Sequence, residues 1–305
     1  MTDNSFESYY GRPILKEPVW KWQIPAYFFA GGIGGASGTL SGLALLTGHE
    51  RLGKVSSYVG AAGDVLSPAF LITDLGRPER FLNMLRVFKP TSPMNMGSWI
   101  LFTSGPAFSL GAVRGLLGWF PRLGRAAAVT SALFGPALAT YTAILLADTA
   151  VPVWHEARDH LPWLFAGSAA MSAGALATLV TPASHAGPAR RLAMGGALAA
   201  LIATQRMEQH LGEIGEPYRT GRAGGLMRAA KGLIAGGALA VAAGGRRRPG
   251  WTLGGAAALV AGAVSERWGV YKAGFASARD PKYVVAPQRR RLAARGGVPS
   301  RRNPR

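Results

Sequence analysis

Long apolar runs constrain this chain more than any other feature of its sequence. A transmembrane helix needs about 20 mostly apolar residues, because the hydrocarbon core is ~30 Å thick and a helix rises about 1.5 Å per residue. Runs of about this length recur along the chain: Ile24–Thr47, Gly53–Leu75, Met96–Gly118, Ala126–Asp148, Leu161–Thr181, Leu192–Gln209, Leu226–Gly245 and Trp251–Ala273. The sequence therefore predicts an all-α, polytopic membrane helix bundle with about eight spans.

The same runs divide the chain into three segments. Residues 1–23 are polar and contain no apolar stretch of the kind that a signal peptide needs, so we expect the first span to act as the insertion signal. Residues 24–273 hold the predicted transmembrane domain. Residues 274–305 are rich in Arg and Lys and are expected to form a basic tail that binds anionic lipid headgroups or an acidic partner.

Small residues recur every four positions in several of the runs. The first run carries Ala30, Gly34, Gly38 and Gly42, and similar stripes begin at Gly232 in the seventh run and at Gly254 in the eighth. Such stripes let helix backbones approach closely in lipid. We expect them to mark helix–helix contacts.

The basic residues are distributed unevenly over the predicted loops. The chain carries 34 Lys and Arg against 15 Asp and Glu, yet charged residues make up only 16% of it. So few charges, combined with long apolar runs, argue against a soluble nucleic-acid-binding protein and favour contact with membrane lipids. With eight spans, 24 of the 34 basic residues fall on the side of both termini, counting Arg267 and all later ones. The positive-inside rule then places both termini in the cytoplasm, in a multi-pass protein of the cell membrane.

Residue types that hold haem and metals are scarce or badly placed. The chain has no cysteine, which excludes Cys-ligated zinc and any iron–sulfur cluster held by this chain. A b-type haem would need histidines that face each other from inside the spans. The histidines instead fall in predicted loops or at span ends: His49, His155, His160, His185 and His210. We therefore expect no haem and no metal site.

One carboxylic acid falls at the centre of a predicted span. Asp64 has about equal lengths of apolar sequence on each side and no basic residue one helical turn away. An ionisable group at membrane depth is costly and by default marks a function. Either a Ser or Thr hydroxyl across a helix interface satisfies this carboxyl, or it takes part in proton transfer. The sequence leaves both interpretations open.

A polar string follows the second predicted span. Residues Asp74–Arg80 read D-L-G-R-P-E-R, in which the proline blocks continuation of the helix and the glycine lets the backbone turn. The alternating charges predict an ordered loop in which Asp74 pairs with Arg77.

A second string opens the third predicted span. Residues Pro90–Trp99 read P-T-S-P-M-N-M-G-S-W. Ser92 or Asn95 is expected to cap the helix, because short polar side chains accept hydrogen bonds from the first free backbone N–H groups. Trp99 suits the aromatic belt at a membrane interface.

Several polar and aromatic residues are expected on one face of the membrane. Even-numbered spans end on the side where the first span begins, so one group of residues shares this face at similar depth: Tyr27, Asp74, Arg77, Tyr141, Asp148 and His155. Tyrosines at an interface are ordinary belt residues. Their combination with carboxylates and a histidine is less ordinary and points to a binding site.

The two polar strings resemble those of the NrfD/polysulfide-reductase membrane subunit family. That family typically shows a D-L-G-R-P-E-R-like string after its second span and a P-x-S-P-M-x-x-G-S-W-like string opening its third. Both are nearly complete here, and the segment Ala273–Tyr283 also looks like the end of such proteins. The resemblance extends along essentially the whole chain.

The resemblance implies a fold, a ligand and partners. Such subunits are haem-free helix bundles that bind a quinone, here expected to be menaquinone. They do so near the face on which a ferredoxin-like iron–sulfur subunit docks. That subunit exchanges electrons with a catalytic subunit that holds a molybdenum or tungsten pterin. Tyr27 and Tyr141 match the family positions that hold the quinone headgroup, whereas Ile24 stands where some relatives carry an amide.

These expectations combine into one functional hypothesis. Tyr27, Tyr141, Asp74, Arg77 and His155 would bind quinone, and two carboxylates would transfer protons: Asp64 and Asp148. Electrons must leave to a cluster in a partner, so the chain alone should catalyse nothing. The alternatives are a passive membrane anchor with a degenerate quinone site, and a proton-coupled secondary transporter that uses Asp64 and contains broken helices.

Overall fold

The computed structural model describes residues 14–118, 121–285 and 287–288, and within them the chain is helical, with no strand. The long helices are α1 (Gln23–Leu46), α2 (Glu50–Asp74), α3 (Pro93–Leu117), α4 (Pro121–Ala147), α6 (Leu161–Val180), α7 (Gly187–Leu211), α8 (Gly221–Gly244) and α9 (Pro249–Arg279). The short elements are η1 (Pro78–Leu85), α5 (Pro152–Glu156) and η2 (Glu216–Tyr218). The predicted all-α class is confirmed.

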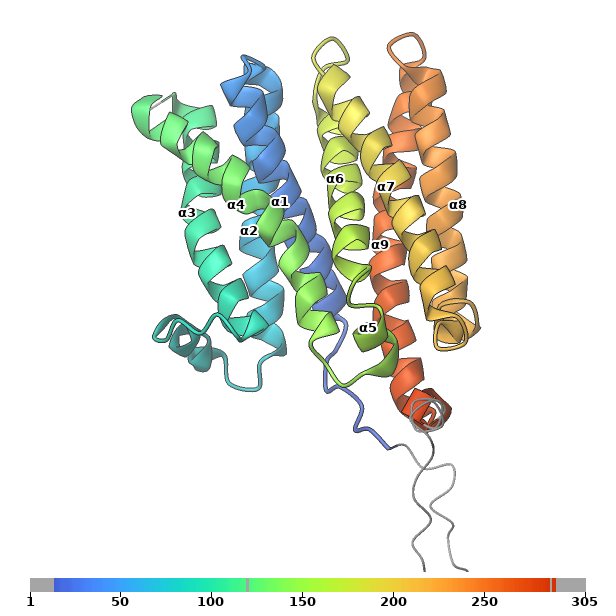
Figure 1. Cartoon of the computed structure of the whole chain (residues 1–305). Helices are drawn as coiled ribbons and strands as arrows, with labels where there is room; N and C mark the ends of the chain where they lie inside the picture. The colour runs from blue at the N-terminus through green and yellow to red at the C-terminus, as the bar shows by residue number, and fades with distance from the viewer. Residues whose placement is uncertain (1–13, 119–120, 286, 289–305) are drawn as a thin grey trace, which may run out of the picture.

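The long helices form two lobes that lie side by side. Helices α1 to α4 make up the first lobe and α6 to α9 the second, and α1 and α4 contact α6 across the seam between them. Figure 1 shows the first and last described segments at the same end of the bundle, together with η1, α5 and η2. We call this end the termini face. The turns after α1, α6 and α8 lie at the other end, the far face.

The apolar character of these helices fits a multi-pass membrane protein. Among the described residues, six helices are long and apolar enough to cross a membrane: α1, α2, α3, α4, α6 and α8. Helices α7 and α9 are as long as the others but fall outside this set. The number of long helices thus equals the predicted eight spans, but only six of these helices are apolar enough to be identified as spans by hydropathy.

The small-residue stripe of the first run packs as predicted. A Cβ at Gly34 would lie 3.0 Å from the backbone nitrogen of Asp64 in α2, and Gly42 sits as closely against the backbone of α4. In the second lobe, Gly244 and Gly262 of the predicted stripes make such contacts, against Thr252 and Ile234. Gly232, Gly236 and Gly254 have open space around them, and Gly237 and Gly255 face each other instead. Close backbone approach therefore shapes both lobes.

One basic residue lies far from its predicted place. Arg267, counted with the basic residues of the C-terminal side, is only 2% exposed and lies within α9 at the seam between the lobes. It adds nothing to the surface charge of the termini face, so that part of the charge count was wrong. Helix α9 continues to Arg279, six residues into the segment assigned to the tail.

Candidate functional site

Two tyrosines from different helices meet inside the first lobe near the termini face. Tyr27 in α1 is 1% exposed and Tyr141 in α4 is 5% exposed. Their hydroxyl groups hydrogen-bond each other, and the rings meet edge to face with centroids 6.3 Å apart. Both residues were predicted to lie on one face, and the structure brings them into contact.

A glycine of the second polar string makes room for this pair. Gly97 lies in the first turns of α3, and a Cβ there would collide with the ring of Tyr141. Interiors are packed closely enough that one extra methyl group at such a contact forces a shift. The glycine of the P-T-S-P-M-N-M-G-S-W string therefore has a physical role, which is to let α3 approach the Tyr141 ring.

Tyr141 also lines a pocket that opens near the termini face between α3, α4 and the α5 segment. The pocket has a volume of about 580 Å³, within the usual range for small-molecule sites. Its lining residues come from the second polar string, the end of α4 and the α5 region: Pro90, Thr91, Pro93, Met96, Ile100, Tyr141, Ile144, Ala147, Asp148, His155, Arg158 and Asp159. Three of the predicted site residues thus share one cavity, while Tyr27 lies behind Tyr141 and outside the lining.

The wall formed by the second polar string is held by hydrogen bonds from its own residues. Ser92 caps α3 by accepting a bond of 3.4 Å from the backbone nitrogen of Asn95, as predicted. The amide nitrogen of Asn95 donates to the carbonyl oxygens of Met84 at 2.5 Å and Val87 at 2.8 Å. The indole of Trp99 donates to the Val87 carbonyl at 3.2 Å. These bonds fix the loop after η1 onto α3.

The opposite wall is anchored to the second lobe through α5. Trp154 is fully buried, its indole nitrogen donates to the carbonyl of Val270 at 2.8 Å, and its ring stacks on Trp20 at 5.5 Å. The neighbouring His155 is exposed to the pocket, and its Nδ1 lies 3.2 Å from the carbonyl oxygen of Ala147. Because a carbonyl only accepts, Nδ1 carries the proton, which leaves Nε2 available as an acceptor.

Asp74 and Arg77 do not line this pocket, and the predicted ion pair between them is wrong. The carboxylate of Asp74 accepts a hydrogen bond of 3.2 Å from the backbone nitrogen of Lys21, just before α1. Within the described part of the chain Arg77 forms no ion pair, and its side chain is exposed. The helix ends at Asp74, so the turn directs the acid toward α1 and the arginine toward the surface.

Asp64 is buried between α2 and α3 and is 7% exposed. Ser104 donates to its Oδ1 at 3.2 Å, so a hydroxyl across a helix interface partners the carboxyl, which was one of the two sequence interpretations. A Cβ at Gly105 would lie 2.7 Å from its Oδ2. Gly97 and Gly105 are eight residues apart, about 12 Å along α3, so the carboxyl and the tyrosine pair lie against the same helix.

A second buried ionic site was not predicted from the sequence. Glu266 and Arg267 lie inside the eighth apolar run, 1% and 2% exposed, with Nη1 of the arginine 3.1 Å from Oε1 of the glutamate. The guanidinium also lies 3.6 Å from the ring centre of Phe165 and donates to its carbonyl oxygen at 3.1 Å. The sequence did contain a signal, because these are two adjacent charged residues within an apolar run. An ionisable residue inside a span by default marks a function, and this rule would have selected the pair as a candidate site.

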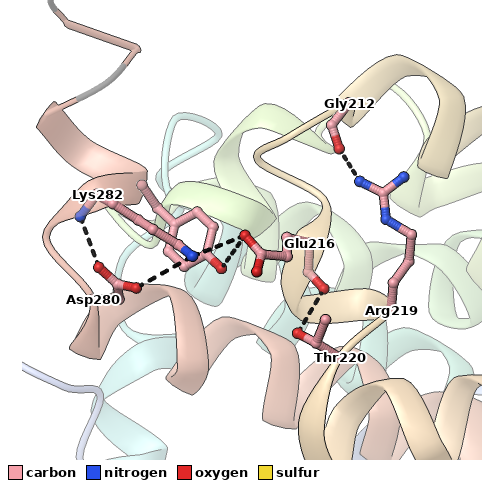
Figure 2. A network of polar contacts seen from close by, with 7 residues as sticks. Gly212, Glu216, Arg219, Thr220, Asp280 and Lys282 are labelled. Atoms are coloured by element: carbon pink, nitrogen blue, oxygen red, sulfur yellow. Dashed lines mark hydrogen bonds and ion pairs between the residues drawn. The ribbon is translucent and has the colours of Figure 1, made fainter.

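Polar contacts tie the end of α9 to the termini face. Figure 2 shows Glu216 of η2 facing Lys282, whose nitrogen lies 2.8 Å from the carboxylate, and Asp280 on the other side of that lysine at 3.6 Å. The hydrogen bond from Lys282 lowers the pKa of Glu216, and the same bond raises the pKa of Lys282. Arg279 pairs with Glu17 at 2.7 and 3.0 Å, which joins the two ends of the described chain.

A sequence model of a family described as polysulfide reductase, NrfD_2, matches residues 6–279, which is most of the chain. No curated protein matches the sequence.

Proposed function

We propose, from the premise that this chain belongs to the NrfD-type polysulfide reductase family, that it is the quinone-binding membrane subunit of a respiratory oxidoreductase complex. In this role it exchanges electrons with a partner iron–sulfur subunit, which in turn serves a molybdo- or tungstopterin catalytic subunit. The observation that carries the proposal is the pocket that Tyr141, Asp148 and His155 line together.

The pocket residues fit a quinone headgroup. The lining combines the apolar side chains of Met96, Ile100 and Ile144 with Tyr141 and titratable side chains. An apolar wall with a few convergent polar groups is the usual form of a small-molecule site. When bound, a quinone supplies two-electron, two-proton redox chemistry. Menaquinone is the proposed species.

The tyrosine pair supports hydrogen-bond donation into the pocket. Two hydroxyls carry two protons, and one of these is used in the bond between Tyr27 and Tyr141. Tyr27 lies outside the pocket lining, so the arrangement in which Tyr27 donates leaves the Tyr141 proton free to point at a ligand. Tyr27 thus acts as a positioning residue that holds the phenol ring and orients its proton.

The protons of the reaction are assigned to exposed groups at the same pocket. Asp148 and His155 both line it and both contact solvent, so they exchange protons with water and with a ligand carbonyl. Asp64 is buried and bonded to Ser104, which makes it a reservoir deeper along α3 rather than a pocket residue. Asp74 and Arg77 are assigned to the loop surface near the partner rather than to the ligand.

The proposal places all eight long helices across the membrane, because α7 and α9 pack against α6 and α8 within the same bundle. The iron–sulfur partner docks on the termini face, since Tyr141 lies at that end and this chain has no cysteine to hold a cluster. A hollow of about 530 Å³ on this face, lined by Arg222, Lys272 and Arg279 among others, suits an acidic partner. This face is proposed to be cytoplasmic.

The alternatives predict different behaviour. A secondary transporter that uses Asp64 should contain broken helices at its binding site. Helices α2 and α3, which enclose Asp64, run without interruption from Glu50 to Asp74 and from Pro93 to Leu117, and this favours the redox proposal. A passive anchor would bind the partner without reacting with quinone.

The experiment that tests the proposal is photolabelling of the purified full-length chain with an azido-naphthoquinone, followed by peptide mapping. We expect label in the peptides that contain Tyr141 and Met96, and we expect unlabelled menaquinone to displace it. Label confined to peptides remote from the pocket would contradict the assignment. Labelling that menaquinone displaces, in a complex that cannot reduce or oxidise it, would identify a passive anchor.

A further inference from the structure

A second cavity of about 570 Å³ lies at the far face, where the two lobes meet. Its mouth lies at the far face, between the turn after α1 and the start of α7, and its lining reaches inward to Ala166 and Ala170 in the first half of α6 and to Thr140 in α4. Its walls come from both lobes and are made of aliphatic side chains, among them Leu40, Leu43, Ala139, Ala166, Ala170 and Leu192. We call it the seam groove.

The hydroxyl groups in the seam groove have no hydrogen atom to offer a ligand. Thr39 donates to the carbonyl of Gly35 at 3.0 Å, Thr140 to that of Pro136 at 2.8 Å, and Thr47 to that of Leu43 at 2.7 Å. Each of these hydroxyl groups therefore donates its hydrogen to a backbone carbonyl of its own helix. A quinone headgroup or a sugar would find no donor along these walls, whereas a hydrocarbon chain needs none.

The mouth of the groove is cationic. Arg191, in the first turns of α7, is exposed and lines the groove, and His49 lines it from the turn between α1 and α2. The neighbouring acid Glu50 is not part of the lining, and its carboxylate lies 3.7 Å from the guanidinium of Arg114. Both groove residues lie at the ends of long helices, at the depth where lipid headgroups begin.

We propose that the seam groove binds an anionic phospholipid of the far-face leaflet, with its acyl chain between the lobes and its phosphate at Arg191. The groove offers apolar contact over its length with one fixed positive charge at its mouth, which is the chemistry of such a lipid. The pocket at Tyr141 is less suited to an anionic headgroup, because two acids, Asp148 and Asp159, line it beside Arg158. The lipid site is independent of quinone binding.

A lipid in this position would bridge the two lobes. Helices α1 and α4 of the first lobe and α6 and α7 of the second all contribute to the lining. In the groove, contacts with the acyl chain replace contacts between side chains of the two lobes. Because a ligand stabilises the state that it binds, the lipid stabilises the arrangement in which the lobes are packed together.

The test uses the delipidated full-length chain, exchanged into an equal mixture of dioleoylphosphatidylglycerol and dioleoylphosphatidylcholine and measured by native mass spectrometry. We expect one lipid to be retained, with about a fivefold preference for dioleoylphosphatidylglycerol over dioleoylphosphatidylcholine. This is the factor that one basic residue near an anionic surface provides. Arg191→Gln should abolish the preference. Arg190→Gln is the matched control, because Arg190 carries the same charge on the same helix, donates to the carbonyl of Ala183 and does not line the groove.

A second variant tests the groove itself. Ala170→Phe fills the cavity from α6 and should abolish retention of both lipids, whereas Ala199→Phe, the same change at an exposed position of α7 outside the lining, should not. Equal retention of both lipids by the wild type would overturn the proposal. So would an equal effect of Arg190→Gln and Arg191→Gln, lipid retained by Ala170→Phe, or displacement of the lipid by menaquinone.

Discussion

The hydroxyl of Tyr27 in α1 bonds the hydroxyl of Tyr141 in α4, and only Tyr141 reaches the pocket near the termini face. This asymmetry separates two effects that one substitution alone would mix. Removing either hydroxyl breaks the same buried hydrogen bond. In the proposed function, removing the Tyr141 hydroxyl also removes the hydrogen-bond donor to the quinone.

The first prediction uses this asymmetry. Tyr141→Phe and Tyr27→Phe should destabilise the protein by similar amounts, about 0.5–1.5 kcal/mol for one lost hydrogen bond. Tyr141→Phe should in addition slow quinone turnover about two- to tenfold more than Tyr27→Phe does. The measurements are thermal unfolding in detergent and quinone reduction by the assembled complex. Turnover that falls equally in both variants would make the tyrosine pair a purely structural contact.

The second prediction concerns the glycine beneath the Tyr141 ring. Gly97→Ala places a methyl group where the ring now lies, so it should cost about 1–3 kcal/mol and distort the pocket. Gly111→Ala in the same helix is the control, because its Cβ would meet the nearest side-chain atom, Cβ of Ser57, at an ordinary distance of 3.5 Å. Unfolding and menaquinone binding are the readouts. Normal menaquinone binding by Gly97→Ala would show that ring position does not matter to the site.

Much of the fold followed from the length of the apolar runs, and the failures have physical causes. The eight runs located the eight long helices, because the length needed to cross a bilayer is a property of local sequence. The Asp74–Arg77 pair failed because adjacent charges in a turn say nothing about which way the chain leaves the helix. Here it turns so that Asp74 meets the Lys21 backbone. The partner of that carboxylate lies 53 residues away and has no pattern in the sequence.

The sequence could predict which residues belong to the site but not how they are arranged in it. Span parity placed Tyr27, Tyr141 and His155 on one face, since consecutive helices reverse direction. It could not show that Tyr27 is behind Tyr141, because that depends on the rotation of each helix about its own axis. Arg267 was wrongly counted with the surface charge of the C-terminal side, because a charge near the end of an apolar run can be taken for the beginning of a loop. Only the length of α9 and the contact with Phe165 place it inside.

The third prediction addresses that buried pair. Arg267→Met leaves Glu266 charged and unpaired at membrane depth, which should cost about 3–5 kcal/mol. Glu266→Gln combined with Arg267→Met should be less destabilising than Arg267→Met alone, because no buried charge is left without a partner. Unfolding in detergent of the two single variants and the double variant measures the coupling. A double variant that is worse than either single one would mean that the two residues act independently.

The fourth prediction concerns pH and the contact between η2 and residues 280–283. Because the bond from Lys282 lowers the pKa of Glu216 below 4.5, this contact stabilises the structure fully above pH 4.5 and is lost as the pH falls through the lowered value. Hydrogen exchange at the amides of Val284 and Val285, which bond to Pro281, should report the loss. Lys282→Gln should remove the pH dependence, and Lys272→Gln should preserve it. Unchanged protection at acidic pH would show that the helix end is held by other contacts.

The last prediction concerns the sidedness of the bundle and the docking of its partner. The chain has no cysteine, so single cysteines can be introduced without a background. Glu79 is exposed in η1 on the termini face, and Arg247 is exposed in the turn after α8 on the far face. In intact cells a membrane-impermeant maleimide should label Arg247→Cys but reach Glu79→Cys only after lysis. A crosslinker attached at Glu79→Cys should capture the iron–sulfur subunit, and one at Arg247→Cys should not. The reverse labelling pattern would place the termini face outside the cell, and capture from Arg247→Cys would move the docking surface to the far face.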